Sequence, residues 1–165
     1  HGSRLMENAM SEAIQDRYAE HYSHCYGCGR LNEQGLQIKS YAEGDVMVCR
    51  FTPRPHDLAV AGVVYGGLIA SLVDCHGVGT AVADRQRRAG VLPDAPVDIV
   101  CVTGSLHVDY LKPTPIDAPV ELRAWVVDVE RRKSVVQVEV WSQDELRARG
   151  EVVAIELTKT SGPGE

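Results

Sequence analysis

The chain has 165 residues, 44% of them hydrophobic, and a formal net charge of −6. This length and apolar content fit one compact domain with its own core, and no membrane span is expected. The acidic balance, without a basic stripe that carries aromatic residues, argues against nucleic acid as a partner. Five cysteines, an odd number without regular pairing, favour reduced thiols and therefore a cytoplasmic protein.

The two ends of the chain are expected to lie outside the main domain. Residues 1–3, His-Gly-Ser, look like a tag remnant, and residues 1–24 as a whole are interpreted as this remnant and a short helical lead. A single domain is predicted over residues 25–160, followed by a frayed tail at 161–165.

The segment HYSHCYGCGRLNEQGL predicts an irregular loop, because it is rich in glycine and contains Asn32. Cys25 and Cys28 form a Cys-x-x-Cys pair flanked by His21 and His24, which suggests a zinc site. A structural zinc site needs four ligands, however, and no second pair follows. A tight turn with buried thiols is the favoured interpretation, so no metal is predicted. The remaining cysteines fall in predicted elements without ligand spacing: Cys49, Cys75 and Cys101.

Residues 37–40 and 45–51 have the alternation of strands, and a turn at residues 43–45 would join them into a hairpin. Pro53 and Pro55 end the second strand. His56 lies in the loop that leads to the next element, so it is a candidate site residue, although a solvated loop histidine is the commoner outcome.

Residues 65–83, YGGLIASLVDCHGVGTAVA, predict a helix that is buried nearly all round. Asp74 is the exception in this apolar stretch, because aspartate is seldom buried unless it is paired or used in chemistry. Helical spacing places Asp74 on a face of small residues that includes Gly67, Ala70 and Ser71. A ligand or a second backbone could approach that face.

The helix opening, Tyr65-Gly66-Gly67, would leave backbone N–H groups free at its positive end, and such groups suit a developing oxyanion. Gly66 and Asp74 are roughly 12 Å apart along the helix at 1.5 Å per residue. A reacting carbonyl must lie about 3 Å from both its oxyanion donor and its attacking group. If both residues act on one substrate, two copies of the chain must therefore meet with antiparallel helices. The alternative is an Asp74 that only binds backbone groups or a neighbouring histidine.

The rest of the chain predicts an antiparallel sheet. The helix is followed by a polar stretch whose arginines either complement the helix dipole or bind phosphates. Apolar and polar residues then alternate clearly along residues 100–110, and Gly104 within them indicates a bulge or a close approach of another backbone. Strands at 120–129, 134–141 and 146–157 follow, joined by short turns. The sum is an α+β domain with one long helix and about six strands, four of them in a terminal meander. Exposed sheet edges would favour dimerisation.

Gly66, Gly67 and Asp74, with VDYLKPTP behind them, resemble the hotdog-fold acyl-CoA thioesterases of the phenylacetic-acid-pathway and 4-hydroxybenzoyl-CoA type. In that family an acidic residue follows the second glycine by seven positions, as here. The resemblance covers residue 35 to about residue 157, and CYGCG…GL at 25–36 resembles a bacterial subgroup with a Cys-x-x-Cys-Gly loop. It implies a hotdog fold, an antiparallel sheet of about five to six strands wrapped around one central helix.

The resemblance also implies roles. Gly66 N–H would polarise the thioester carbonyl, and Asp74 of the neighbouring subunit would be the general base or nucleophile, with Gly67 and Tyr65 at the same helix end. The acyl-CoA would need no cofactor and no metal, and the protein would be at least a homodimer, possibly a dimer of dimers. Residues assigned to substrate binding are His56, Asn32, Ser71 and the turn Arg131, Arg132, Lys133 and Ser134. For the turn, CoA phosphate contacts and a solvated charge run are equally open.

Two departures from the family pattern leave other functions open. Where the family has a histidine before the two glycines, this chain has Tyr65, which cannot titrate near neutrality. Where many members have Asn or Gln six residues earlier, this chain has Ala59. His56 or Asn32 could compensate. A second hypothesis is therefore a non-catalytic protein that binds acyl-CoA or a lipophilic ligand. A third is a hotdog dehydratase, which would use His76 or His107.

Overall fold

The computed structural model describes residues 12–158, so the predicted tag remnant and the tail lie outside the described residues. Within this range, two short 3₁₀ helices precede the sheet, and one α-helix accompanies six strands. In chain order the elements are η1 (Ile14–Arg17), η2 (Glu20–Tyr22), β1 (Tyr41–Glu43), β2 (Val46–Phe51), α1 (Gly66–Arg88), β3 (Cys101–Tyr110), β4 (Val120–Glu130), β5 (Lys133–Ser142) and β6 (Glu145–Glu156).

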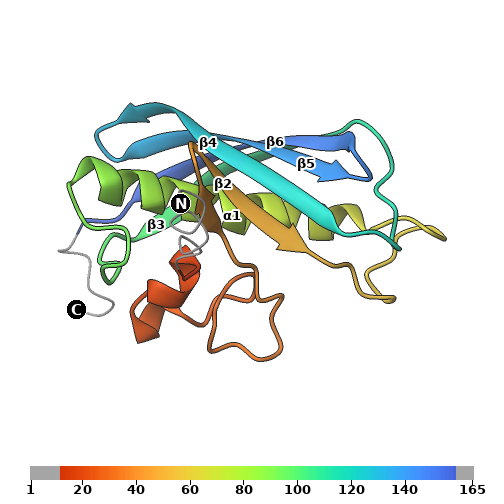
Figure 1. Ribbon diagram of the computed structural model, residues 1–165, viewed down its shortest axis with the longest axis horizontal. Helices are drawn as coiled ribbons and strands as arrows, with labels where there is room; N and C mark the ends of the chain where they lie inside the picture. The colour runs from red at the N-terminus through yellow and green to blue at the C-terminus, as the bar shows by residue number, and fades with distance from the viewer. Residues whose placement is uncertain (1–11, 159–165) are drawn as a thin grey trace, which may run out of the picture.

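The six strands form one antiparallel sheet in the order β1-β2-β4-β5-β6-β3. The helix α1 runs along one face of this sheet, and the N-terminal segment lies on the other side of α1 (Figure 1). Because α1 is covered from two sides, most of its side chains are buried, as its composition predicts. The arrangement confirms the predicted hotdog fold.

Two predictions about the strands are wrong. Residues 37–40 are not the first strand, because their backbone groups bind the N-terminal segment: Ile38 N–H donates to Gly27 O, and Ile14 N–H donates to Ser40 O. The four C-terminal strands are not a simple meander either, since β3 pairs with β6 and not with β4. Only residues 131–132 and 143–144 separate β4 from β5 and β5 from β6, which forces these strands to be neighbours. The longer connection at 111–119 lets the chain cross to the opposite part of the sheet.

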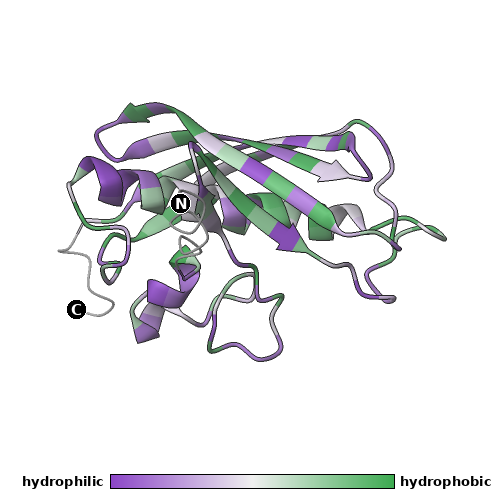
Figure 2. Cartoon of the chain, viewed as in Figure 1, coloured by the Kyte–Doolittle hydropathy of each residue, from purple (hydrophilic) through white to green (hydrophobic). Residues whose placement is uncertain are grey.

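The core lies between α1 and the sheet. Hydrophobic and hydrophilic residues alternate along β4 (Figure 2), which is typical of a sheet with one face on the core. Two glycines let helix and sheet approach closely. A Cβ on Gly77 would come within 2.5 Å of Val152, and a Cβ on Gly150 would come within 2.3 Å of Val73. Larger residues at either position would push α1 away from the sheet.

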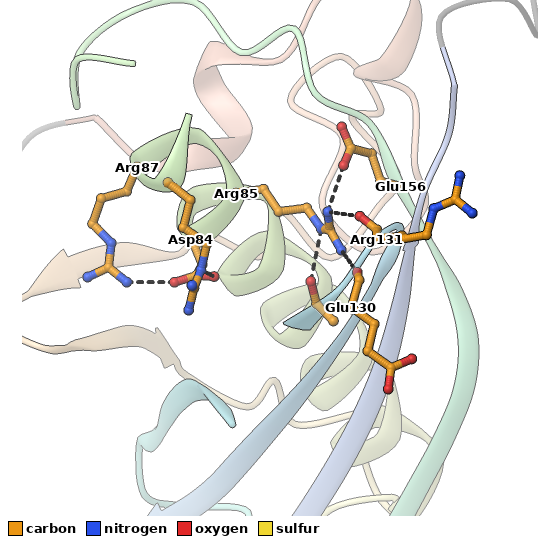
Figure 3. Close-up of polar contacts among 8 residues, drawn as sticks. Asp84, Arg85, Arg87, Glu130, Arg131 and Glu156 are labelled. Carbon is orange, nitrogen blue, oxygen red and sulfur yellow. Dashed lines mark hydrogen bonds and ion pairs between the residues drawn. The ribbon is translucent and has the colours of Figure 1, made fainter. Parts of the chain in front are cut away.

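The helix continues past residue 83, where its end was predicted, to Arg88. Arg85 in its last turn is buried and binds the β4–β5 turn and β6 (Figure 3). Its guanidinium donates to Ser134 Oγ at 2.9 Å, to Glu156 Oε2 at 2.7 Å and to the carbonyls of Glu130 and Arg131. A buried cation needs such partners, so Arg85 holds the end of the helix to the sheet.

By length and composition alone α1 approaches a membrane span, contrary to the sequence-based expectation that nothing would. More than half of its most apolar window is nevertheless buried inside the protein, as in the core helix of a globular domain. Its apolar character is therefore accounted for by packing against the sheet and the N-terminal segment.

Candidate active site

The N-terminus of α1 offers two free backbone donors. The helix begins at Gly66, directly after the extended residue Tyr65, and its first hydrogen bond runs from Leu68 N–H to Tyr65 O at 3.0 Å. Within residues 12–158, neither Gly66 N–H nor Gly67 N–H donates to another protein group. Both donors lie at the positive end of the helix dipole, where an oxygen with developing negative charge is stabilised.

Two tyrosines flank this helix end. Tyr65 is 57% exposed and its ring covers Gly67, so closely that a Cβ there would lie 2.4 Å from the ring. Tyr110, at the end of β3, donates its hydroxyl hydrogen to Gly66 O at 2.6 Å. Partial burial, with a contribution from nearby Tyr65, raises the pKa of Tyr110. The hydroxyl of Tyr110 therefore stays protonated and fixes the first residue of the helix against β3.

Asp74 is half-buried on the face of α1 that carries small residues. Its Oδ1 accepts a hydrogen bond from Thr103 Oγ1 of β3 at 2.6 Å. Within the described residues, no hydrogen bond or ion pair involves its Oδ2. Its partner is thus a threonine, and not the backbone group or histidine of the alternative interpretation. Ser71 uses its hydroxyl within the helix, donating to Gly67 O at 2.9 Å.

Thr103 and Tyr110 are site residues that the sequence reasoning missed. Strict alternation along residues 100–110 places these two on opposite faces of the strand. The register of β3 against β6 shifts between Thr103 and Ser105, which confirms the predicted irregularity at Gly104. An extra residue reverses the facing of every residue after it. Thr103 before the bulge and Tyr110 after it therefore both contact α1.

Asp74 borders a cavity of about 330 Å³ between α1, the start of β3 and the N-terminal segment. Its walls are mainly apolar, and Asp74, Thr103 and three thiols are among the few polar groups that line it. The apolar lining includes Val78, Val82, Val97, Ile99, Val100 and Leu157. A carboxylate beside an apolar space of this size can meet the reactive group of a ligand whose hydrocarbon part fills the cavity.

The three thiols belong to Cys25, Cys28 and Cys75, whose sulfur atoms all lie within 4.8 Å of one another. Sequence spacing pointed to Cys25 and Cys28 but not to Cys75, which comes from α1, directly after Asp74. Hydrogen bonds from Cys28 and Cys75 lower the pKa of Cys25, and the same bonds to Cys25 raise the pKa values of the other two thiols.

Other predicted residues lie elsewhere in the protomer. His56 is exposed, with Nε2 3.9 Å from Asp57 Oδ1, and Asn32 binds within its own loop, donating to His24 O at 3.2 Å. Neither residue lines the Asp74 cavity. Their roles in substrate binding therefore stay predictions.

The two histidines of the dehydratase hypothesis do not line the Asp74 cavity either. His76 is fully buried, and burial lowers its pKa to about 4. Its Nε2–H donates to Met47 O at 3.0 Å, while its Nδ1 accepts from Ser40 Oγ at 2.7 Å. His107 is exposed on β3 and pairs with Asp109 at 3.0 Å. The structure gives the dehydratase hypothesis no support.

The β4–β5 turn divides into exposed and buried residues. Arg131, Arg132 and Lys133 are exposed, and in Figure 3 the guanidinium of Arg131 points away from Arg85. Arg132 donates from Nε to Glu156 O at 2.9 Å. Ser134, by contrast, is fully buried and accepts from Arg85. Its hydroxyl is therefore placed to hold Arg85 and not, as predicted, to contact a CoA phosphate.

Comparison with known proteins identifies the family. The sequence profile of the thioesterase superfamily matches residues 61–149. The structure is similar to a thioesterase superfamily protein from Shewanella loihica, which is 39% identical with a TM-score of 0.63 over 84% of this chain and 97% of that chain. It is also similar to a point mutant of the phenylacetic acid degradation protein PaaI from Thermus thermophilus, which is 27% identical with a TM-score of 0.58 over 74% of this chain and 95% of that chain.

A curated protein also matches. The acyl-coenzyme A thioesterase THEM4 of Xenopus laevis is 29% identical over 109 residues, which are 66% of this chain and 43% of that protein. This chain thus spans less than half the length of that relative. The chain belongs to the thioesterase superfamily, and thioester hydrolysis is the general activity that this membership supports.

Proposed function

We propose that the protein hydrolyses acyl-CoA thioesters at sites shared between two protomers. In each site, Gly66 N–H of one protomer binds the carbonyl oxygen and Asp74 of the facing protomer is the general base or nucleophile. The observation that carries the proposal is the environment of Asp74. Its Oδ1 accepts from Thr103, its Oδ2 has no hydrogen-bond partner within residues 12–158, and the residue borders an apolar cavity.

The length of α1 supports a shared site. Gly66 and Asp74 belong to one unbroken helix, so their separation along it is roughly 12 Å and one carbonyl cannot reach both. The edge strand β3 offers the means of association. It is ten residues long and exposes Val102 by 43%, Leu106 by 39% and Tyr110 by 55%. An unprotected edge of this kind favours pairing with another strand, and an antiparallel β3–β3 contact would bring two α1 helices together in opposite directions.

The reaction needs only groups that the site supplies. Asp74 takes a proton from water as the water oxygen attacks the carbonyl carbon, and the negative charge on the carbonyl oxygen is stabilised by Gly66 N–H. Collapse of the tetrahedral intermediate breaks the carbon–sulfur bond and releases the CoA thiolate and the free acid. If Asp74 attacks directly, an acyl–enzyme anhydride forms with loss of CoA thiolate, and water then hydrolyses it.

The surroundings of Asp74 support an acyl-CoA as substrate. The apolar cavity beside Asp74 accommodates an acyl group, and the cations Arg131, Arg132 and Lys133 lie toward the same end of the sheet. Arg132 binds Glu156 O, and the next residue, Leu157, lines the cavity. These exposed cations are our choice for the CoA phosphates. The name of the curated relative, an acyl-coenzyme A thioesterase, agrees with this substrate class.

Hydrolysis of short, medium, long and aromatic acyl-CoAs, followed by release of free thiol, tests the proposal. Asp74→Asn is expected to lower kcat by about a hundredfold or more, the scale of a lost general base. Asp128→Asn, at an exposed acidic residue of β4, is the matched control and should keep full activity. A wild-type protein that binds acyl-CoA without turning over any of them would instead establish the alternative, a non-catalytic binding protein.

A further inference from the structure

The three-thiol group of Cys25, Cys28 and Cys75 is not used by the proposed hydrolysis. Cys25 and Cys28 come from the N-terminal loop, and Cys75 comes from the middle of α1, so the group joins two segments that are distant in sequence. Cys25 is exposed, while Cys28 and Cys75 are half-buried. All three line the cavity that Asp74 borders.

The loop around these cysteines is shaped to bring its backbone onto Cys75. A Cβ on Gly27 would lie 2.3 Å from Cys75 Sγ, so only glycine permits this approach. Backbone bonds fix the loop on both sides: Gly29 N–H donates to Cys25 O at 2.8 Å, and Ile38 N–H donates to Gly27 O at 2.9 Å. The backbone of the loop is therefore held directly against Cys75, which brings the three cysteines together from two distant segments.

The sulfur separations exclude a disulfide and leave room for a metal ion. Two sulfurs in a disulfide are about 2.05 Å apart. Thiolates bound to a tetrahedral zinc ion at about 2.3 Å are about 3.8 Å apart. Cys25 Sγ and Cys75 Sγ are 3.9 Å apart, and the third sulfur is within 4.8 Å of each. The Cys25–Cys75 separation is thus close to one edge of such a tetrahedron, and the third sulfur lies near enough for small side-chain rotations to complete the set.

We propose that Cys25, Cys28 and Cys75 bind one zinc ion as thiolates. Among the described residues, no fourth histidine, cysteine or carboxylate ligand atom lies within 4.8 Å of all three sulfurs. His21 and His24 are therefore not ligands, and water from the cavity fills the fourth position. On binding, the ion displaces the protons of the thiols into solvent. Soft thiolate ligands in a tetrahedral arrangement favour zinc over harder divalent ions.

The site would act as a clasp between the N-terminal loop and the helix. It ties residues 25–28 to α1 at the position directly after Asp74 and closes one side of the cavity. This inference stands apart from the proposed hydrolysis, because it rests on the sulfur geometry and is tested by metal binding. It also replaces the expectation that no metal would be bound.

The test is the metal content of protein purified without chelator, without a polyhistidine tag and under reducing conditions. We expect about one zinc ion per protomer by elemental analysis. Cobalt added to the metal-free protein should give the sulfur-to-cobalt charge-transfer absorption of a thiolate site. Cys75→Ser should weaken cobalt binding by at least about tenfold and reduce that absorption by roughly a third, because one of three thiolates is lost. The control is Cys101→Ser, which removes a thiol of the same cavity outside the group and should change neither quantity.

Three results would overturn the inference. The first is wild-type protein with free thiols that binds neither zinc nor cobalt. The second is unchanged cobalt absorption in Cys75→Ser, which would show that Cys75 is not a ligand and that Cys25 and Cys28 bind the ion together with a histidine. The third is a disulfide among the three cysteines in freshly prepared protein, detected by mass spectrometry. If Cys75→Ser does not fold, Cys25→Ser gives the same readout at an exposed position.

Discussion

Replacing Gly66 by proline removes one N–H group from the proposed oxyanion site with little change to the fold. Gly66 is the first residue of α1, and its N–H has no acceptor within residues 12–158, so helix stability does not depend on it. Proline is favoured at this position of a helix. Tyr65, with ψ at 127°, already has the conformation required before proline. An added Cβ would meet Tyr110 at 3.5 Å, an ordinary contact.

The expected loss follows from the missing donor. Removing one oxyanion donor lowers kcat by roughly 100- to 1000-fold, or about 2.7–4 kcal/mol of transition-state stabilisation. Gly66→Ala is the matched control, because it adds the same Cβ and keeps the N–H, and we expect it to stay within a few-fold of wild type. Acyl-CoA hydrolysis is measured for both variants, with thermal unfolding as the check on folding. Equal activity of the proline and alanine variants would refute the role of Gly66 N–H.

Two further predictions concern Thr103 and His76. Thr103→Val removes the hydrogen bond to Asp74 Oδ1 and should lower kcat by about tenfold with little change in KM, since a bond to a charged group contributes about 1.5–3 kcal/mol. Thr103→Ser, which keeps the hydroxyl, should restore kcat, and equal kcat in the two variants would rule out this positioning role. For His76, burial lowers the pKa from 6.5 to about 4. Between pH 6.5 and about pH 4 the imidazole is therefore protonated in the unfolded chain but neutral in the folded protein. Neutral His76 therefore does not lower the free energy of unfolding above about pH 6.5, and this free energy falls toward pH 4 by on the order of 3 kcal/mol in total. Urea unfolding at about pH 7 and about pH 5 should show this loss in wild type but a smaller one in His76→Gln, and equal losses would contradict the assignment.

The sequence was sufficient where one local rule decides the outcome. The helix around Asp74 follows from a long apolar stretch without proline, and the free donors at Gly66 follow from helix geometry alone. The irregularity at Gly104 was also predictable, since a glycine inside a strand pattern marks a bulge. These features depend on residues close together in the chain.

Features that depend on tertiary contacts were missed. Alternation along β3 could not show that the bulge turns both Thr103 and Tyr110 toward α1. Cys75 has no ligand spacing to Cys25 and joins it only because the N-terminal loop folds over the helix. Ser134 reads as part of an exposed charged turn, yet it is buried because Arg85 comes from the end of a helix that runs further than its apolar stretch.

The shared site is the central claim, and a hybrid dimer tests it most directly. Asp74→Asn and Gly66→Pro chains carrying different affinity tags are expressed together, and the dimers that contain one of each are isolated. If each site takes Gly66 from one protomer and Asp74 from the other, the hybrid has one site with both defects and one intact site. Its rate per dimer should be roughly half that of wild type, although both parent variants are nearly inactive. A hybrid as inactive as its parents would show that each site lies within a single chain and would contradict the account.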